Sequence, residues 1–199
     1  MGNNVINCTG LSCPIPVVNT KKYLDSIESG SCITIVDNEI AKNNVVKLAS
    51  NSGFGFKVEE KESMFYITID KNCDIKAKKN DYNKEIKDDA PFTIVIASKE
   101  LGDGSDELGA ALMKSYLFAL SEADVIPENL LFLNGGVKLV VEDSPAIESL
   151  KKLEKRGTKI LSCGLCLDFY HLKDKIAIGE ITNMYAIVEI MNSSRTIKL

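Results

Sequence analysis

The stretch Gly10-Leu11-Ser12-Cys13-Pro14-Ile15-Pro16 places a cysteine directly before two prolines that are spaced one residue apart. The preceding Val5-Ile6-Asn7 is short and partly β-branched, which predicts a strand. Apolar residues then recur at helical spacing until Gly30. Because proline is tolerated in the first turn of a helix, we predict a strand-to-helix turn whose helix starts at Cys13 or one residue before it.

This predicted helix start has a chemical consequence for the Cys13 sulfur. The positive end of a helix dipole favours thiolate over thiol, and the thiolate is the nucleophile. The remaining amides of the turn, such as those of Ile15 and Val17, are expected to point towards the sulfur. A cysteine that serves only for packing needs none of these features, so Cys13 is a candidate catalytic nucleophile. Cys8 is either a resolving thiol or a packed residue, and packing is favoured.

The composition limits the class of protein. The chain has 199 residues, of which 45% are hydrophobic and 26% charged, as in ordinary globular proteins. A net charge of −4 argues against a nucleic-acid partner or a polybasic membrane surface. No apolar run approaches the roughly 18 residues of a membrane span, and the first residues do not resemble a signal peptide. We therefore expect a cytoplasmic protein, in which six cysteines are free, catalytic or metal-bound rather than a disulfide framework.

Residues 1–70 predict a small α+β domain. A β-branched strand at 32–37 follows the first helix, and Asp37 or Asn38 can cap a second helix. Apolar residues of that helix can share one inner stripe, and they are Ile40, Val45, Leu48 and Ala49. Alternating apolar residues at 54–58 and 65–69 indicate an antiparallel hairpin. The predicted order is βαβαββ, a two-layer sandwich with both helices on one face of the sheet.

Residues 71–91 differ in composition from the segments on either side. They contain six lysines and five Asp or Glu residues, with few apolar side chains. Such a segment cannot bury enough apolar surface to hold itself rigid, so we predict a charged flexible linker. As a coil it would span roughly 25 Å, enough for one domain to visit the other or a partner.

Residues 92–199 predict an α/β domain with a doubly wound parallel sheet, because strands alternate with helices. Strands are expected at 92–97, 130–133, 159–162 and 196–198. Helices are expected at 144–157, at about 180–191 and, after a capping loop at 102–107, at 108–120. The apolar face of the 108–120 helix is expected to consist of Leu108, Leu112, Tyr116 and Leu120, with Met113 and Leu117. In such sheets the functional loops lie at the carboxyl ends of the strands, where Cys163 and Cys166 are expected.

The Cys163-Gly164-Leu165-Cys166 pattern is compatible with several kinds of site. A zinc site would need two further ligands, and the chain has no second Cys-X-X-Cys and one histidine, His171, so zinc stays an alternative only if docked domains supply His171, Cys8 or Cys13. Attack and release at sulfur need no metal or organic cofactor, and none is expected. A thioredoxin-like redox pair is an alternative, since Cys-X-X-Cys can depress the pKa of a thiol. We favour a single acceptor cysteine that is assisted by its neighbour.

These motifs resemble known families. Through the Gly-Leu-X-Cys-Pro-X-Pro segment that contains Cys13, residues 5–70 resemble the TusA-like (SirA-like) sulfur-carrier domain, and residues 92–199 resemble a DsrE-like domain. Segments at 133–139, 162–168 and 179–184, together with the join of the two domains, resemble the YedF proteins associated with selenium metabolism. Carrier domains often have an acidic residue and an arginine where this chain has Asn7 and Thr9.

The resemblance implies that Cys13 carries sulfur or selenium as a persulfide or perselenide, and that the loop of Cys163 and Cys166 is the acceptor region. It also implies a cysteine desulfurase or another persulfide donor, a downstream acceptor protein, and a homo-oligomer formed through the DsrE-like domain. The predicted function is therefore a sulfurtransferase-like carrier and relay. The alternative is a non-enzymatic redox-sensing or partner-binding module that uses the pair Cys163 and Cys166.

Overall fold

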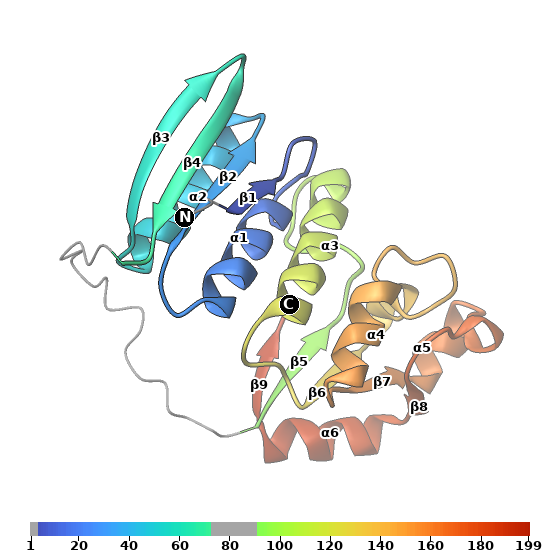
Figure 1. Ribbon diagram of the computed structural model, residues 1–199. Helices are drawn as coiled ribbons and strands as arrows, with labels where there is room; N and C mark the ends of the chain where they lie inside the picture. The colour runs from blue at the N-terminus through green and yellow to red at the C-terminus, as the bar shows by residue number, and fades with distance from the viewer. Residues whose placement is uncertain (1–3, 73–90) are drawn as a thin grey trace. The chain divides into compact units, whose positions relative to one another are not determined.

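The computed structural model describes residues 4–72 and 91–199 (Figure 1). The chain forms two compact units, divided between residues 87 and 88, and each unit is described by itself. The predicted linker at 71–91 lies outside the described residues except for Lys71, Asn72 and Pro91. Within the described ranges, no helix is both long and apolar enough to cross a membrane.

The N-terminal unit has the predicted βαβαββ order. Its elements are β1 (Asn4–Asn7), α1 (Ile15–Ser26), β2 (Ser31–Val36), α2 (Glu39–Asn51), β3 (Gly55–Lys61) and β4 (Met64–Asp70). The four strands form one mixed sheet in the order β1-β2-β4-β3. The strand β1 runs parallel to β2, whereas β2 with β4 and β4 with β3 pair antiparallel, as the hairpin prediction requires.

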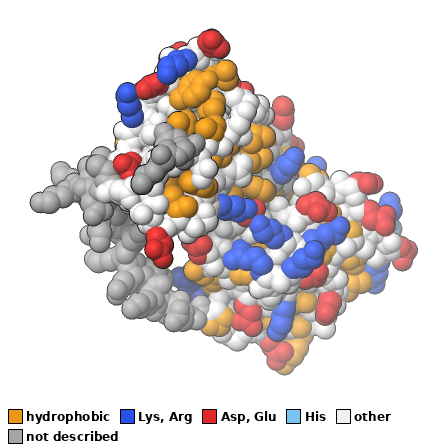
Figure 2. Space-filling view, in the orientation of Figure 1, with side chains coloured by type: hydrophobic (Ala, Val, Ile, Leu, Met, Phe, Trp, Pro, Cys, Tyr) orange, Lys and Arg blue, Asp and Glu red, His pale blue; other side chains and the backbone are white. Residues whose placement is uncertain are grey.

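Alternation along the strands gives this sheet one buried face. Cys32, Thr34 and Val36 of β2 lie opposite Ile69, Ile67 and Phe65 of β4, and all six side chains are buried. They pack with Leu24 of α1 and with Ala41, Val45 and Ala49 of α2 in one core. The other face is partly exposed, and Figure 2 shows hydrophobic side chains gathered over the sheet of this unit. The unit is thus a two-layer sandwich with both helices packed in a single core.

Two local predictions for this unit are wrong. The helix α1 begins at Ile15, with Pro14 in the N-cap position, and not at Cys13 or before it. The Val18 amide donates to the Pro14 carbonyl oxygen at 3.1 Å, which is the first hydrogen bond of helical spacing, so Cys13 precedes the helix. The side chain of Ile40 is 69% exposed and does not belong to the inner stripe, which Ala41, Val45 and Ala49 form instead.

The C-terminal unit is an α/β domain with an entirely parallel sheet. Its strands are β5 (Phe92–Ile96), β6 (Asn129–Phe132), β7 (Lys159–Cys163), β8 (Glu180–Thr182) and β9 (Arg195–Lys198). Its helices are α3 (Asp106–Glu122), α4 (Ile147–Lys155), α5 (Gly164–Phe169) and α6 (Met184–Ser193), with short 3-10 turns η2 (Asn134–Leu139) and η3 (Lys173–Lys175). The strand order is β8-β7-β6-β5-β9.

Both faces of this sheet are covered, as a doubly wound fold requires. On one face, Ile94, Leu130 and Ile160 pack in a core with residues of α3 and α4. On the other face, Val95, Leu131 and Cys163 pack with Ile187 of α6. Figure 1 shows α6 on the opposite side of the sheet from α3 and α4. The unbroken burial of β5 and β6 follows from this double cover.

Two sequence predictions for this unit also need correction. The predicted helix at about 180–191 is the strand β8 followed by α6, because residues 180–182 pair with residues 161–163 of β7. In α3 the buried stripe consists of Gly109, Met113, Leu117 and Ser121, whereas Leu108 and Leu112 are exposed. The predicted cap at the start of α3 is confirmed, since the Ser105 hydroxyl accepts a hydrogen bond from the Leu108 amide.

Candidate functional site

The loop between β1 and α1 is held by hydrogen bonds where it leaves β1. The Cys8 amide donates to the Ile35 carbonyl oxygen at 2.8 Å, which extends the pairing of β1 with β2. The Asn7 side-chain oxygen accepts from the Thr9 amide at 3.0 Å and from the Thr9 hydroxyl at 2.8 Å. Asn7 and Thr9, which depart from the carrier pattern, therefore form a local turn with each other.

The next residue of the loop is fixed by a long-range contact. The Gly10 amide donates to a carboxylate oxygen of Asp37 at 2.6 Å, and Asp37 directly follows β2. Gly10 has a φ of +74°, which glycine adopts without steric cost. This hydrogen bond, followed by one from the Asn38 side chain, lowers the pKa of Asp37. Asp37 thus holds the turn three residues before Cys13, while Asn38 caps α2 by accepting from the Ala41 amide at 2.8 Å.

The Cys13 side chain is exposed, and its sulfur has a polar neighbour from α2. The Asn44 side-chain amide donates to Cys13 Sγ at 3.4 Å. The expectation that the Ile15 amide points towards this sulfur is wrong, because that amide donates to the Ser12 carbonyl oxygen at 3.0 Å. The sulfur therefore gains a donor from a side chain 31 residues away in sequence.

Cys8 and Cys32 differ from Cys13 in their burial. Both side chains are fully buried in the core of the N-terminal unit. Burial raises the pKa of Cys8, although its weak 3.9 Å hydrogen bond from Asn19 opposes the shift. Burial also raises the pKa of Cys32 to about 11. The packing role that we favoured for Cys8 is thereby confirmed.

The second pair of candidate residues lies at the carboxyl end of β7. Cys163 is the last residue of this strand and the N-cap residue of α5, and its side chain is 1% exposed. Cys166 is partly exposed and packs against the cluster to which Cys163 belongs. Both thiols are free. Among the predicted site residues, the structure brings these two together, and Cys13 belongs to the other unit.

The loop that follows the neighbouring strand β6 supplies a donor to Cys166. The backbone amide of Asn134 donates to Cys166 Sγ at 3.1 Å. The Asn134 side-chain oxygen accepts from the Tyr170 hydroxyl at 2.9 Å, and the Lys138 ammonium lies 4.4 Å from the centre of the Tyr170 ring. These contacts connect the carboxyl ends of β6 and β7 around one sulfur.

Close packing fixes the position of the Asn134 amide. Gly136, two residues later, lies so near β5 that an added Cβ would be 2.1 Å from the Ile96 carbonyl oxygen. The Gly136 amide donates to the Leu133 carbonyl oxygen at 2.8 Å, and Asn134 has a φ of +43°. Only glycine fits at position 136 without moving the backbone, so the loop has little freedom to shift.

Burial and the neighbouring thiol determine how readily Cys166 ionises. Burial is the larger cause and raises the pKa of Cys166, and the adjacent Cys163 raises it further. The Asn134 amide acts in the opposite direction because it stabilises the thiolate. Cys166 is therefore a weaker acid than a free cysteine, with a donor positioned for its anion.

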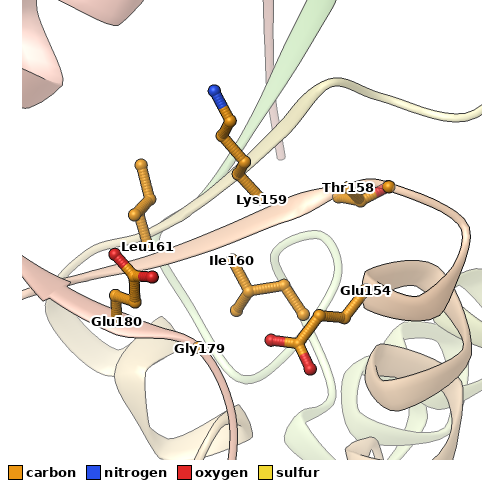
Figure 3. Close-up of a pocket in the computed structure, with 8 residues that line it drawn as sticks. Glu154, Thr158, Lys159, Ile160, Leu161, Gly179 and Glu180 are labelled. Atoms are coloured by element: carbon orange, nitrogen blue, oxygen red, sulfur yellow. The ribbon is translucent and has the colours of Figure 1, made fainter.

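A metal cluster and a surface hollow are two further kinds of site. Across residues 4–72 and 91–199, no group of three or more His, Cys, Asp or Glu side chains could hold a metal ion, and His171 is exposed. A hollow of about 470 Å³ lies beside β7 and β8, near Glu154, Lys159 and Glu180. Figure 3 shows Lys159 pointing away from Glu154 there. The hollow is lined by residues 159–161 of β7 and by Gly179 and Glu180, and neither Cys163 nor Cys166 lines it.

Sequence reasoning did not identify Asn44, Asn134 or Tyr170 as parts of either site. Asn44 has the spacing of a polar helix residue, and nothing in the pattern relates it to Cys13. Asn134 acts on Cys166 through its backbone amide, which has no side-chain signature. The signal that could have identified Asn134 is the pair Gly135-Gly136 directly after a buried strand, since such glycines often permit a close backbone approach.

Each of the two units matches a known protein family. Residues 4–71 match the family "Sulfurtransferase TusA", and residues 94–199 match the "DsrE/DsrF-like family". Two curated relatives bear the name "Putative sulfur carrier protein". MJ0990 of Methanocaldococcus jannaschii is 38% identical over 68 residues, which is 33% of this chain and 91% of the relative. YrkI of Bacillus subtilis is 33% identical over 52 residues, which is 26% of this chain and 69% of the relative.

Solved structures also match each unit. The SirA-like protein from Desulfitobacterium hafniense is 33% identical, covers 34% of this chain and 95% of its own, and has a TM-score of 0.33. The ychN protein from E. coli is 13% identical, covers 55% of this chain and 99% of its own, and has a TM-score of 0.44. Because the DsrE/DsrF-like match covers more than half of the chain and the sulfur-carrier match spans nearly all of a curated relative, this chain belongs to the DsrE/DsrF-like family and bears a TusA sulfur-carrier domain at its N-terminal end.

Proposed function

We propose that this protein is a sulfurtransferase-like carrier that receives sulfur or selenium on Cys13 as a persulfide or perselenide. The observation that supports this most strongly is the geometry of Cys13. Its side chain is exposed, its loop is held by the Gly10–Asp37 hydrogen bond, and Asn44 donates to its sulfur. A transferable cargo needs a thiol that is accessible to a donor, and Cys8 and Cys32 are buried.

The loading step is an exchange at sulfur. The Cys13 thiolate attacks the terminal sulfur or selenium of a donor persulfide, the donor thiolate leaves, and Cys13 retains the cargo. Neither a metal nor an organic cofactor takes part in this exchange. Two curated relatives that are named as putative sulfur carriers support the carrier role. Selenium as a cargo is proposed only because the arrangement of the two domains resembles that of the YedF proteins.

The cargo then passes to Cys166 of the C-terminal unit, within one chain or between chains. Cys166 is the natural acceptor because it is partly exposed and has the Asn134 amide at its sulfur, whereas Cys163 is buried. Exposed apolar side chains lie on the helices that contribute to both sites: Ile40 precedes Asn44, the donor to Cys13, by one turn of α2, and Leu165 and Phe169 share α5 with Cys166. Exposed apolar side chains are typical of contacts with protein partners, here a cysteine desulfurase or another persulfide donor and a downstream acceptor protein.

The test is intact-mass measurement of the reduced, metal-free protein after incubation with a cysteine desulfurase and cysteine. Wild type, Cys13→Ser and the Cys163→Ser/Cys166→Ser double variant are compared. We expect a gain of one sulfur mass that dithiothreitol removes and that is absent only in Cys13→Ser. Loading that is lost only in the double variant would place the nucleophile in the C-terminal unit instead.

A second candidate function rests on the contact between Cys163 and Cys166. Two free thiols that lie together can form a reversible disulfide, so the C-terminal unit could act as a redox-sensing or partner-binding module. This function predicts oxidation of the pair without any transferable sulfur on the chain. The intact-mass experiment separates the two functions in the Cys163→Ser/Cys166→Ser variant, which gains and keeps one sulfur mass if Cys13 is a carrier, whereas a redox-sensing pair adds sulfur to none of the chains.

A further inference from the structure

The two thiols at the end of β7 have unequal access to solvent. The Cys163 side chain is 1% exposed and packs with Val95, Leu131 and Ile187, while Cys166 packs against the same cluster and is partly exposed. The two thiols are near enough for Cys163 to raise the pKa of Cys166. A thiol that is buried in this way can react with the sulfur of its neighbour but not with a partner protein.

The spacing of the two cysteines permits a bond between them. Cys163 is the N-cap residue of α5, and Cys166 lies in the first turn of that helix, three residues later. Side chains three residues apart on a helix are neighbours, with about 5–6 Å between their Cβ atoms. A disulfide needs Cβ atoms roughly 3.5–4.5 Å apart, so the bond forms when this turn closes.

We propose that Cys163 releases the cargo from Cys166 as free sulfide or selenide. This step rests on the proposed function, which places a persulfide or perselenide on Cys166. The Cys163 thiolate attacks Sγ of Cys166, a bond forms between the two cysteine sulfurs, and the bond from Cys166 Sγ to the outer sulfur or selenium breaks. The outer atom leaves with the electron pair of that bond and takes up the protons as hydrogen sulfide or hydrogen selenide.

The balance of this step closes without an external reagent. One sulfane sulfur or its selenium counterpart gains two electrons, and the two cysteine thiols become one disulfide. A second turnover requires a dithiol reductant of the thioredoxin class or a small dithiol, which exchanges with the disulfide. The C-terminal unit would thus convert a bound, protein-carried cargo into a free anion, which is the form that an enzyme using sulfide or selenide requires.

The arrangement around Cys166 suits an attack from the inside. Cys163 is buried and Cys166 is partly exposed, so an attack by Cys163 comes from the core and lets the outer atom of a Cys166 persulfide depart towards solvent. Attack at the outer atom instead would move the cargo into the core beside Ile187, where an anion is poorly solvated. The geometry therefore favours release over a second transfer.

The experiment loads the full-length chain directly with a small-molecule persulfide, glutathione persulfide, so that it does not depend on Cys13. Every chain in the comparison also has the Cys13→Ser substitution, and the donor is removed by desalting before sulfide release is followed. Four chains are compared: the Cys13→Ser chain itself, and the same chain with Cys163→Ser, Cys166→Ser or Cys32→Ser added. Cys32 is a matched control, because it is equally buried and lies in the other unit.

We expect the otherwise unchanged chain and Cys32→Ser to release about one sulfide per chain and to lose the mass of two hydrogens. Cys163→Ser should keep its persulfide on Cys166, with release slowed about tenfold or more, and Cys166→Ser should not load in the C-terminal unit. Cys163→Ala provides a second variant if the serine disturbs the core, and disulfide formation in the Cys13→Ser chain is a readout that needs no change at Cys163.

Release from Cys163→Ser at the unchanged rate, or a stable Cys166 persulfide beside a reduced Cys163, would overturn the proposal. A chain that never loads on Cys166 would overturn the relay as well, whereas loading without release overturns this step alone.

Discussion

The backbone amide of Gly10 donates a 2.6 Å hydrogen bond to the Asp37 carboxylate, which joins two residues that are 27 positions apart. This contact connects the loop that presents Cys13 to the end of β2 and the start of α2. The same α2 supplies Asn44, whose side-chain amide donates to the Cys13 sulfur. The loop, the strand end and the helix therefore act together to place one thiol.

The Gly10–Asp37 contact makes the loop sensitive to acid. The hydrogen bond holds the pKa of Asp37 below its ordinary value of 3.8, so the contact is fully present above that value and is lost as the pH falls through the lowered pKa. We expect the NMR shift of the Gly10 amide to be constant from pH 5 to 8 and to titrate with a midpoint below 3.8. Asp37→Asn is the control, since it keeps an acceptor oxygen but cannot titrate. A midpoint at or above 3.8 in wild type would contradict the contact.

Removal of the Asn44 amide should weaken the reaction of Cys13. In Asn44→Ala the Cys13 sulfur loses the side-chain donor that lies 3.4 Å away. A hydrogen bond at an exposed position contributes about 0.5–1.5 kcal/mol, so the rate of persulfide loading should fall about 2- to 10-fold. Asn43→Ala, at the neighbouring exposed position of α2, should load at the wild-type rate. Equal loading rates for the two variants would show that Asn44 has no part in the reaction.

The cysteines should differ in their reactivity towards iodoacetamide. Burial and the neighbouring Cys163 raise the pKa of Cys166, so its alkylation rate should still increase above pH 9.0, the ordinary value for a thiol. Cys32, whose pKa is raised to about 11, and the buried Cys8 and Cys163 should stay unmodified in the folded protein. Peptide mapping in a Cys73→Ser background follows each site. Alkylation of Cys163 before Cys166 would contradict the order of access described for this pair.

The loop that holds the Asn134 amide should not tolerate a side chain at position 136. In Gly136→Ala the new Cβ would lie 2.1 Å from the Ile96 carbonyl oxygen, so β5 and the loop must separate. We expect the free energy of unfolding of the C-terminal unit to fall by about 1–3 kcal/mol, measured by urea denaturation. Gly135→Ala is the matched control, because its nearest contact would be 3.8 Å, and it should change stability by less than about 0.5 kcal/mol. Equal stability of the two variants would contradict this packing.

The sequence allowed the fold to be predicted where local patterns coincide with tertiary packing. Alternation in β2 and β4 and the continuous apolar run of β5 were sufficient, because burial itself produces those patterns. The strand β8 could not be separated from α6, since three residues are too short for a period and only the pairing with β7 defines them. Ile40 is apolar and therefore fits the predicted inner stripe, yet it lies one position away from the buried Ala41 and is exposed.

For the candidate site, the sequence indicated the cysteines but not what surrounds them. The two prolines and the Cys-X-X-Cys spacing are local features, so Cys13, Cys163 and Cys166 could be named from them. The donors to these sulfurs come from residues 31 and 32 positions away, and one of them is a backbone amide. Such contacts depend on how the strands and helices pack, which local spacing does not encode.

The most direct test of the central claim is site-resolved mass spectrometry of the full-length protein during loading by a cysteine desulfurase and cysteine. Samples are alkylated at successive times, and fragment ions distinguish Cys13 from Cys8 and Cys166 from Cys163. We expect one sulfur to be bound first at Cys13 and later at Cys166, and to be absent from both in Cys13→Ser. Sulfur that is bound first at Cys166, or that reaches the Cys13→Ser chain from the desulfurase at the wild-type rate, would contradict the carrier role of Cys13.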